Sequence, residues 1–208
     1  MKMISKDTEI YCSFSSNPGN NGCIFFNDKF QKNGINAIYK SFYSDDIEKS
    51  IEAVKSLDIK GFALSMPFKI EVLNYLDEVE TSAKNIGSVN TVVNNQGHLI
   101  GYNTDWIGVQ KYFDLRDFDF IYIIGNGGFS KAVQYTCDIM DIKFDIITRE
   151  NWGMIEELED KIIFNATPVD IKTENYLVDG RPFTDDGKKM ALYQAKEQFK
   201  IYTGVQID

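Results

Sequence analysis

A glycine-rich turn is the first feature of the sequence whose residue types and spacing suggest chemistry. The run Gly125-Asn126-Gly127-Gly128-Phe129-Ser130 follows the almost uniformly apolar stretch 118–124 and opens the helical pattern 131–140. Glycines between a buried strand and a helix let backbone N–H groups approach a pyrophosphate. The third position of the usual fingerprint is Ser130 rather than glycine. The turn therefore predicts a dinucleotide site, and a tight turn without a ligand is the alternative interpretation.

The sequence Thr148-Arg149-Glu150 ends the next predicted strand and bears on the choice of dinucleotide. An acidic residue at this place accepts hydrogen bonds from a ribose hydroxyl, whereas an arginine pairs with a 2′-phosphate. Because Arg149 comes first, we predict NADP, with NAD as the alternative. An arginine at a strand end is also a common solvated surface residue, and this interpretation stays open.

The elements that position these residues alternate between strands and helices. The first half predicts strands over 10–14, 37–42 and 61–65, helices over 23–31 and 44–57, a hairpin from 89–93 and 99–102, and a helix over 105–113. The second half predicts three strands over 118–124, 144–148 and 162–164, with helices over 131–140 and 152–158 between them. This βαβαβ order is typical of a small Rossmann-type sheet.

We therefore expect an α/β protein with an N-terminal substrate-binding catalytic domain over 1–103. A shortened Rossmann-type NAD(P)-binding domain is expected over 104–175, followed by a C-terminal segment over 176–208. The apolar positions of its last helix, 188–202, predict that this helix packs back on the first domain.

Composition narrows the classes of function. The chain has 208 residues, 43% of them hydrophobic and 25% charged, with a net charge of −9. Such a charge provides no positive field for nucleic acid or anionic lipid. Three scattered cysteines, Cys12, Cys23 and Cys137, argue against a disulfide framework and favour a cytoplasmic location. One histidine and no Cys-x-x-Cys spacing make a zinc site unexpected.

Three blocks resemble the shikimate dehydrogenase family: residues 61–69 (GFALSMPFK), 87–93 (GSVNTVV) and 101–108 (GYNTDWIG). The glycine-rich turn, Asn165-Ala166-Thr167-Pro168 and Tyr193-Gln194-Ala195 follow in the family's order. The likeness covers residues 10–205 and is closest to the divergent shikimate-dehydrogenase-like branch. It implies NADP-dependent, reversible oxidation of a hydroxyl on a small hydroxylated carboxylic acid, in aromatic amino acid biosynthesis.

The resemblance also assigns roles to individual residues. Lys69 contacts the reacting hydroxyl as acid or base, and Asp105 orients that hydroxyl and shares its proton, which is chemistry that a tuned lysine and aspartate can perform. Asn90, Ser65, Gln194 and Asn20 are expected to bind substrate. The expected cofactor-binding residues are Gly125, Asn126, Gly127, Gly128, Phe129, Ser130, Arg149 and Thr167.

The sequence departs from the family in two places. The serine pair that binds the substrate carboxylate in the biosynthetic enzymes falls near Asn20 and Gly22, which lack hydroxyls. The chain is also several dozen residues shorter, with losses between 149 and 165 and between 170 and 187. Two alternatives to an enzyme follow: a non-catalytic ligand-binding relative with an eroded cofactor domain, and an accessory protein that needs a partner chain. A monomer and a homodimer are both compatible with the sequence.

Overall fold

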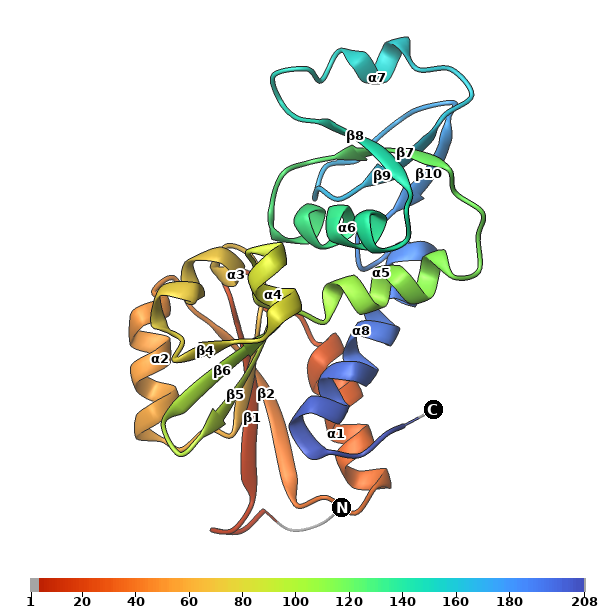
Figure 1. Cartoon of the computed structure of the whole chain (residues 1–208). Coiled ribbons are helices and arrows are strands. Elements are labelled where there is room, and N and C mark those ends of the chain that lie inside the picture. Colours follow the sequence, from red (N-terminus) through yellow and green to blue (C-terminus); the bar gives the residue numbers. More distant parts are fainter. Residues whose placement is uncertain (1–3, 208) are drawn as a thin grey trace. The chain divides into compact units, whose positions relative to one another are not determined.

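The computed structural model describes residues 4–207, and the chain divides into two compact units (Figure 1). The first unit holds the chain up to Asn103 together with the segment from Ala195 onward. The second unit holds Thr104–Gln194. The chain therefore passes between the units twice. Within residues 4–207, no helix has the length and apolar character needed to cross a bilayer.

The first unit contains a six-stranded mixed sheet in the order β2-β1-β3-β5-β6-β4. Its strands are β1 (Glu9–Ser15), β2 (Ala37–Tyr43), β3 (Gly61–Leu64), β4 (Glu78–Val79), β5 (Thr91–Asn95) and β6 (His98–Tyr102). Its helices are α1 (Asn21–Lys32), α2 (Ile47–Ser56), α3 (Phe68–Glu71), the 3-10 helix η1 (Val72–Tyr75) and α4 (Thr81–Ile86). The α/β class and the predicted hairpin of β5 and β6 are confirmed.

Both faces of this sheet are buried, because neighbouring residues of a strand point to opposite sides. Cys12 and Phe14 of β1 pack in one core with Ile51 and Val54 of α2. Tyr11, which precedes Cys12 and therefore points to the opposite face, packs in a second core with residues of α1 and of the C-terminal helix. In that aromatic core the Tyr11 hydroxyl donates to the backbone oxygen of Tyr202 at 3.2 Å. The same strand thus anchors both layers of helices.

The second unit is a parallel sheet in the order β10-β9-β7-β8 (Figure 1). Its strands are β7 (Phe120–Ile124), β8 (Lys143–Ile147), β9 (Ile162–Asn165) and β10 (Tyr176–Asp179). One face is packed by α5 (Asp105–Phe113) and α6 (Gly128–Ile139), and isoleucines of the other face pack with Ile155 of the short α7 (Met154–Glu157). The Rossmann-type order expected from the sequence is confirmed, with strands of four or five residues.

The fourth strand, β10, was not predicted. Tyr176–Asp179 pairs in parallel with Ile162–Asn165 and lengthens the sheet by one edge strand. The expected domain boundary at residue 175 cuts this sheet, and the domain limits themselves stay predictions. The strand has a weak sequence signal because only Leu177 and Val178 are strongly apolar, and Gly180 and Pro182 come shortly after them.

The last helix, α8 (Asp185–Thr203), begins in the second unit and ends in the first. In the second unit, Met190 packs with Val109 and Phe113 of α5. In the first unit, Phe199 and Tyr202 belong to the aromatic core with Phe26 and Phe30. The prediction that this helix packs back on the N-terminal domain is therefore confirmed.

Candidate functional site

Ser65, Lys69 and Asn90 gather at the carboxyl end of β3 through backbone hydrogen bonds. The Leu64 N–H donates to the backbone oxygen of Asn90 at 2.8 Å, and the Val89 N–H donates to that of Lys69 at 2.7 Å. These two bonds fix α3, which carries Lys69, against the start of β5. The Asn90 side chain is 3% exposed and accepts from the Thr91 hydroxyl at 2.9 Å. The structure thus brings these three predicted residues together within the first unit.

The loop before α1 contains the positions that replace the family's serine pair. Asn20 is exposed, and its side-chain amide makes no hydrogen bond with the described part of the chain. A methyl group built at Gly22 would approach the Tyr39 ring to 3.0 Å. The aromatic ring of Tyr39 therefore takes the space that a larger residue at position 22 would need. Packing against Tyr39 therefore explains why position 22 is a glycine, which has no side-chain hydroxyl.

Asp105 is the first residue of α5 and belongs to the second unit, with an exposed fraction of 8%. It follows Thr104, whose hydroxyl accepts a hydrogen bond from the Gln194 amide at 2.9 Å. Close packing of α5 on α8 makes this contact possible, since a methyl group at Gly108 would meet the backbone oxygen of Met190 at 2.5 Å. Gln194, in the middle of α8, is thus held beside Thr104, the residue that precedes Asp105.

The glycine-rich turn follows β7, and its glycines serve different purposes. Gly125 has φ +110°, a conformation that other residues adopt only under strain, and a methyl group there would lie 2.9 Å from Thr167 Cγ2. Ser130 is fully buried, and its hydroxyl donates to the Gly125 backbone oxygen at 2.6 Å. Gly125, Ser130 and Thr167 therefore shape the turn from within. The Thr167 hydroxyl likewise donates to Asn165 Oδ1 at 2.8 Å.

Gly127, by contrast, has no structural reason to be glycine. Its φ of −88° suits any residue, and a methyl group there would meet no heavy atom within 4 Å. Gly127 is the N-cap of α6 and supplies no side-chain hydrogen bond. The first N–H groups of this 12-residue helix can therefore donate to a ligand. A backbone left bare at this point fits the close approach of a pyrophosphate. The residues present therefore fit a dinucleotide.

The remaining predicted cofactor residues surround this turn. Asn126 and Arg149 are exposed and make no side-chain hydrogen bond within residues 4–207, and Arg149 lies two residues beyond β8. The Phe129 ring instead packs on Phe164, with 6.0 Å between ring centroids. Its side chain is structural, while its N–H lies in the first turn of α6.

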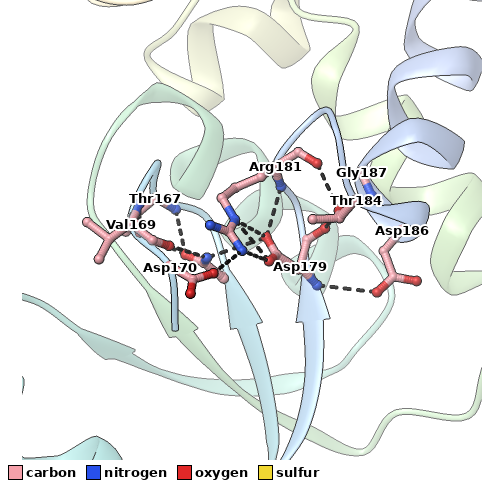
Figure 2. Close-up of polar contacts among 9 residues, drawn as sticks. Thr167, Val169, Asp170, Asp179, Arg181, Thr184, Asp186 and Gly187 are labelled. Atoms are coloured by element: carbon pink, nitrogen blue, oxygen red, sulfur yellow. Dashed lines mark hydrogen bonds and ion pairs between the residues drawn. The ribbon is translucent and has the colours of Figure 1, made fainter. Parts of the chain in front are cut away.

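Arg181 is a polar residue of the carboxyl edge that sequence reasoning missed (Figure 2). Its Nη2 donates to Asp170 Oδ1 and to Asp179 Oδ2, both at 2.6 Å, and its Nε donates to both oxygens of Asp179. These bonds to Asp179, and then to Asp170, raise the pKa of Arg181 above its ordinary value. The two carboxylates come from the loop after β9 and from the end of β10. No local sequence pattern therefore indicates that they meet at Arg181.

Known proteins resemble the chain in sequence and in structure. The family model for the shikimate dehydrogenase substrate binding domain matches residues 22–92. A shikimate dehydrogenase-like protein of Haemophilus influenzae is 45% identical over 134 residues, which cover 63% of this chain and 49% of that protein. That match thus spans about half of the relative's length.

Other comparisons extend over the whole chain. Shikimate dehydrogenase (NADP(+)) of Pyrococcus furiosus is 34% identical, with 99% of this chain and 94% of that protein covered. The solved structure of a shikimate 5-dehydrogenase-like protein has a TM-score of 0.81 at 30% identity, covering 99% of this chain and 95% of that one. The chain therefore belongs to the shikimate dehydrogenase family.

Proposed function

We propose that the protein is an NADP-dependent dehydrogenase that reversibly oxidises a hydroxyl on a small, shikimate-like hydroxylated carboxylic acid. The observation that carries this proposal is the bare backbone at Gly127, beside the open first turn of α6, in a member of this family. The bound dinucleotide supplies the hydride acceptor. Proton transfer and substrate orientation are left to the chain's own side chains.

Lys69 is the proposed proton-transfer group. It lies on α3, and its backbone oxygen accepts from the N–H of Val89, the residue before buried Asn90. An amine held in place can take the hydroxyl proton as hydride leaves, and return it in the reverse direction. Asn90 is proposed to bind neighbouring hydroxyls, and Ser65 and Gln194 to add further polar contacts. The role implied for Asp105, sharing the hydroxyl proton, also remains a proposal.

Arg149 supports the choice of NADP over NAD. Its guanidinium lies just beyond β8 without a protein partner among the described residues, whereas Glu150 accepts a hydrogen bond from the Thr148 hydroxyl at 3.0 Å. A free guanidinium is suited to a 2′-phosphate. For the substrate carboxylate, the unbonded amide of Asn20 is the proposed donor in place of the family's serines.

The alternative of a non-catalytic relative with an eroded cofactor domain is not favoured. Four parallel strands remain, and the turn after β7 keeps its open backbone. The first experiment is therefore a titration of NADPH and NADH followed by nicotinamide fluorescence. We expect NADPH to bind more tightly, and Arg149→Gln to remove most of that preference. Failure of both cofactors to bind at millimolar concentration would contradict the proposal.

Turnover tests the catalytic assignment. Wild type, Lys69→Met and the matched control Lys84→Met, an exposed lysine of α4, are compared on shikimate, quinate and related alcohols. Loss of a positioned acid–base group costs about 10²–10⁴-fold in kcat. We expect that loss for Lys69→Met and none for Lys84→Met, with NADPH affinity unchanged in both. Equal turnover by wild type and Lys69→Met would refute the assigned role.

A further inference from the structure

The order of the strands predicts where each half of a dinucleotide lies. In a doubly wound sheet the ligand crosses the carboxyl ends of the strands at the switch point. Here the phosphate-binding turn follows β7, and Arg149 follows β8 on one side of it. The adenosine half is then expected over β8, which leaves the carboxyl ends of β9 and β10 for the nicotinamide half.

At the carboxyl end of β9, the side chains of Asn165 and Thr167 are already bonded within the protein. The Asn165 amide donates to the Val169 backbone oxygen at 2.9 Å, and its oxygen accepts from the N–H and hydroxyl of Thr167. What remains available comes from Asp170 and Arg181 (Figure 2). The Nη1 group of Arg181 and Oδ2 of Asp170 make no hydrogen bond with residues 4–207, although Nη2 and Oδ1 of the same pair are bonded at 2.6 Å.

This pair offers donor and acceptor groups from side chains that are bonded to each other. The Arg181 side chain is 12% exposed and is held by Asp179, which is 11% exposed, whereas the Asp170 side chain is 66% exposed. Phe183 adds an aromatic ring at the same edge, 64% exposed, with its centroid 5.0 Å from Arg181 Cζ. A planar aromatic amide needs a donor for its carbonyl, an acceptor for its NH₂ and a flat apolar surface.

We propose that Asp170, Arg181 and Phe183 bind the nicotinamide end of the cofactor, an inference that rests on the proposed function. Arg181 Nη1 donates to the carboxamide oxygen, Asp170 accepts from the carboxamide NH₂, and Phe183 packs against the ring. The short connection from β10 to α8, residues 180–184, carries Arg181 and Phe183. Gly187 maintains this tight connection, because a methyl group there would overlap the Arg181 backbone oxygen.

The net charge of Asp170, Asp179 and Arg181 predicts an effect on cofactor affinity that a purely structural role of these residues would not produce. One guanidinium and two carboxylates leave a net negative charge beside a ring that is positive in NADP⁺ and neutral in NADPH. Asp170→Asn keeps the shape and removes that charge. We expect NADP⁺ to bind about fivefold more weakly, the upper range for an exposed charge pair, with a smaller change for NADPH. Phe183→Ala should weaken both forms by about fivefold.

The experiment compares binding of NADP⁺, NADPH and 2′,5′-ADP, which contains only the adenosine half, by calorimetry. Both variants should bind 2′,5′-ADP like wild type. The control Glu174→Gln removes an exposed charge at the amino end of β10, the opposite edge of the sheet, and should change nothing. These changes leave Arg181 and its bond to buried Asp179 intact, so the fold is not at risk.

Two results would overturn the inference while leaving the proposed function standing. One is wild-type affinity of both variants for NADP⁺. The other is an equal loss for NADP⁺ and 2′,5′-ADP, which would indicate a general disturbance of the sheet edge. If wild type binds neither NADP⁺ nor 2′,5′-ADP, the proposed function fails and this inference fails with it.

Discussion

Two alanine substitutions in one turn, Gly127→Ala and Gly125→Ala, should have opposite consequences for stability and for cofactor binding. At Gly127 the backbone angles are φ −88° and ψ −177°, and the added methyl group meets nothing within 4 Å. At Gly125 φ is +110°, and the methyl group lies 2.9 Å from Thr167 Cγ2. The first substitution therefore fills only the space proposed for pyrophosphate, while the second strains the fold.

The magnitudes follow from these geometries. Alanine at Gly127 gains about 0.4–1 kcal/mol by restricting the unfolded chain. It loses about 0.5–1 kcal/mol because alanine is a poorer N-cap than glycine. The two nearly cancel. Alanine at Gly125 costs about 1–3 kcal/mol in backbone strain, and the contact with Thr167 adds about 1–3 kcal/mol.

Tryptophan fluorescence is the appropriate assay for stability, since Trp106 and Trp152 both belong to the second unit. In guanidinium melts we expect an unchanged midpoint for Gly127→Ala and a clearly lower one for Gly125→Ala. NADPH affinity of the stable Gly127→Ala variant should fall about tenfold or more, equivalent to ~1.4 kcal/mol. Wild-type affinity in that variant would refute the reasoning, and so would equal destabilisation by both substitutions.

Three further outcomes are expected. Lys69→Met should lower kcat by about 10²–10⁴-fold and leave the thermal melting of the first unit, followed by circular dichroism, unchanged. Gly22→Ala should destabilise that unit by about 1–2 kcal/mol through the Tyr39 ring, and Tyr39→Leu should relieve the cost in a double-mutant cycle. Burial raises the pKa of the Cys137 thiol to about 12, so the unfolded thiol ionises first as pH rises above about 9 and stability falls by up to ~1.4 kcal/mol per pH unit. Cys137→Ala should show a shallower loss between pH 9 and 11 in guanidinium melts, and an identical slope would contradict this.

The fold was predictable where the hydrophobic pattern and the turn-forming residues indicated the same helix or strand. The helix expected over 105–113 is α5, and the strands expected from apolar runs are β7 and β8. The strand β10 was missed because it is four residues long and is recognised mainly through its pairing with β9. The two-residue strand β4 is defined in the same way by β6. Short strands take their stability from neighbours, and a single sequence does not contain those neighbours' positions.

The site was predictable where backbone geometry is encoded locally. The turn after β7 was found from its glycines, but the division between Gly125, a steric necessity, and Gly127, an open surface, required the position of Thr167. Ser130 looked like a cofactor residue, while its hydroxyl is bonded to the Gly125 oxygen. Arg181 was overlooked because its partner Asp170 is 11 positions away, on another strand's loop.

The continuity of α8 has a consequence for biosynthesis of the chain. The aromatic core around Tyr11 is completed by Phe199 and Tyr202, which are translated after the whole of the second unit. Domains usually fold as they leave the ribosome, N-terminal ones first. Here the nascent N-terminal unit must wait for the whole second unit to be synthesised before its core can close. The first unit is thus completed only after the second has been made, and a chain truncated after Gln194 would lack Phe199 and Tyr202 from its aromatic core.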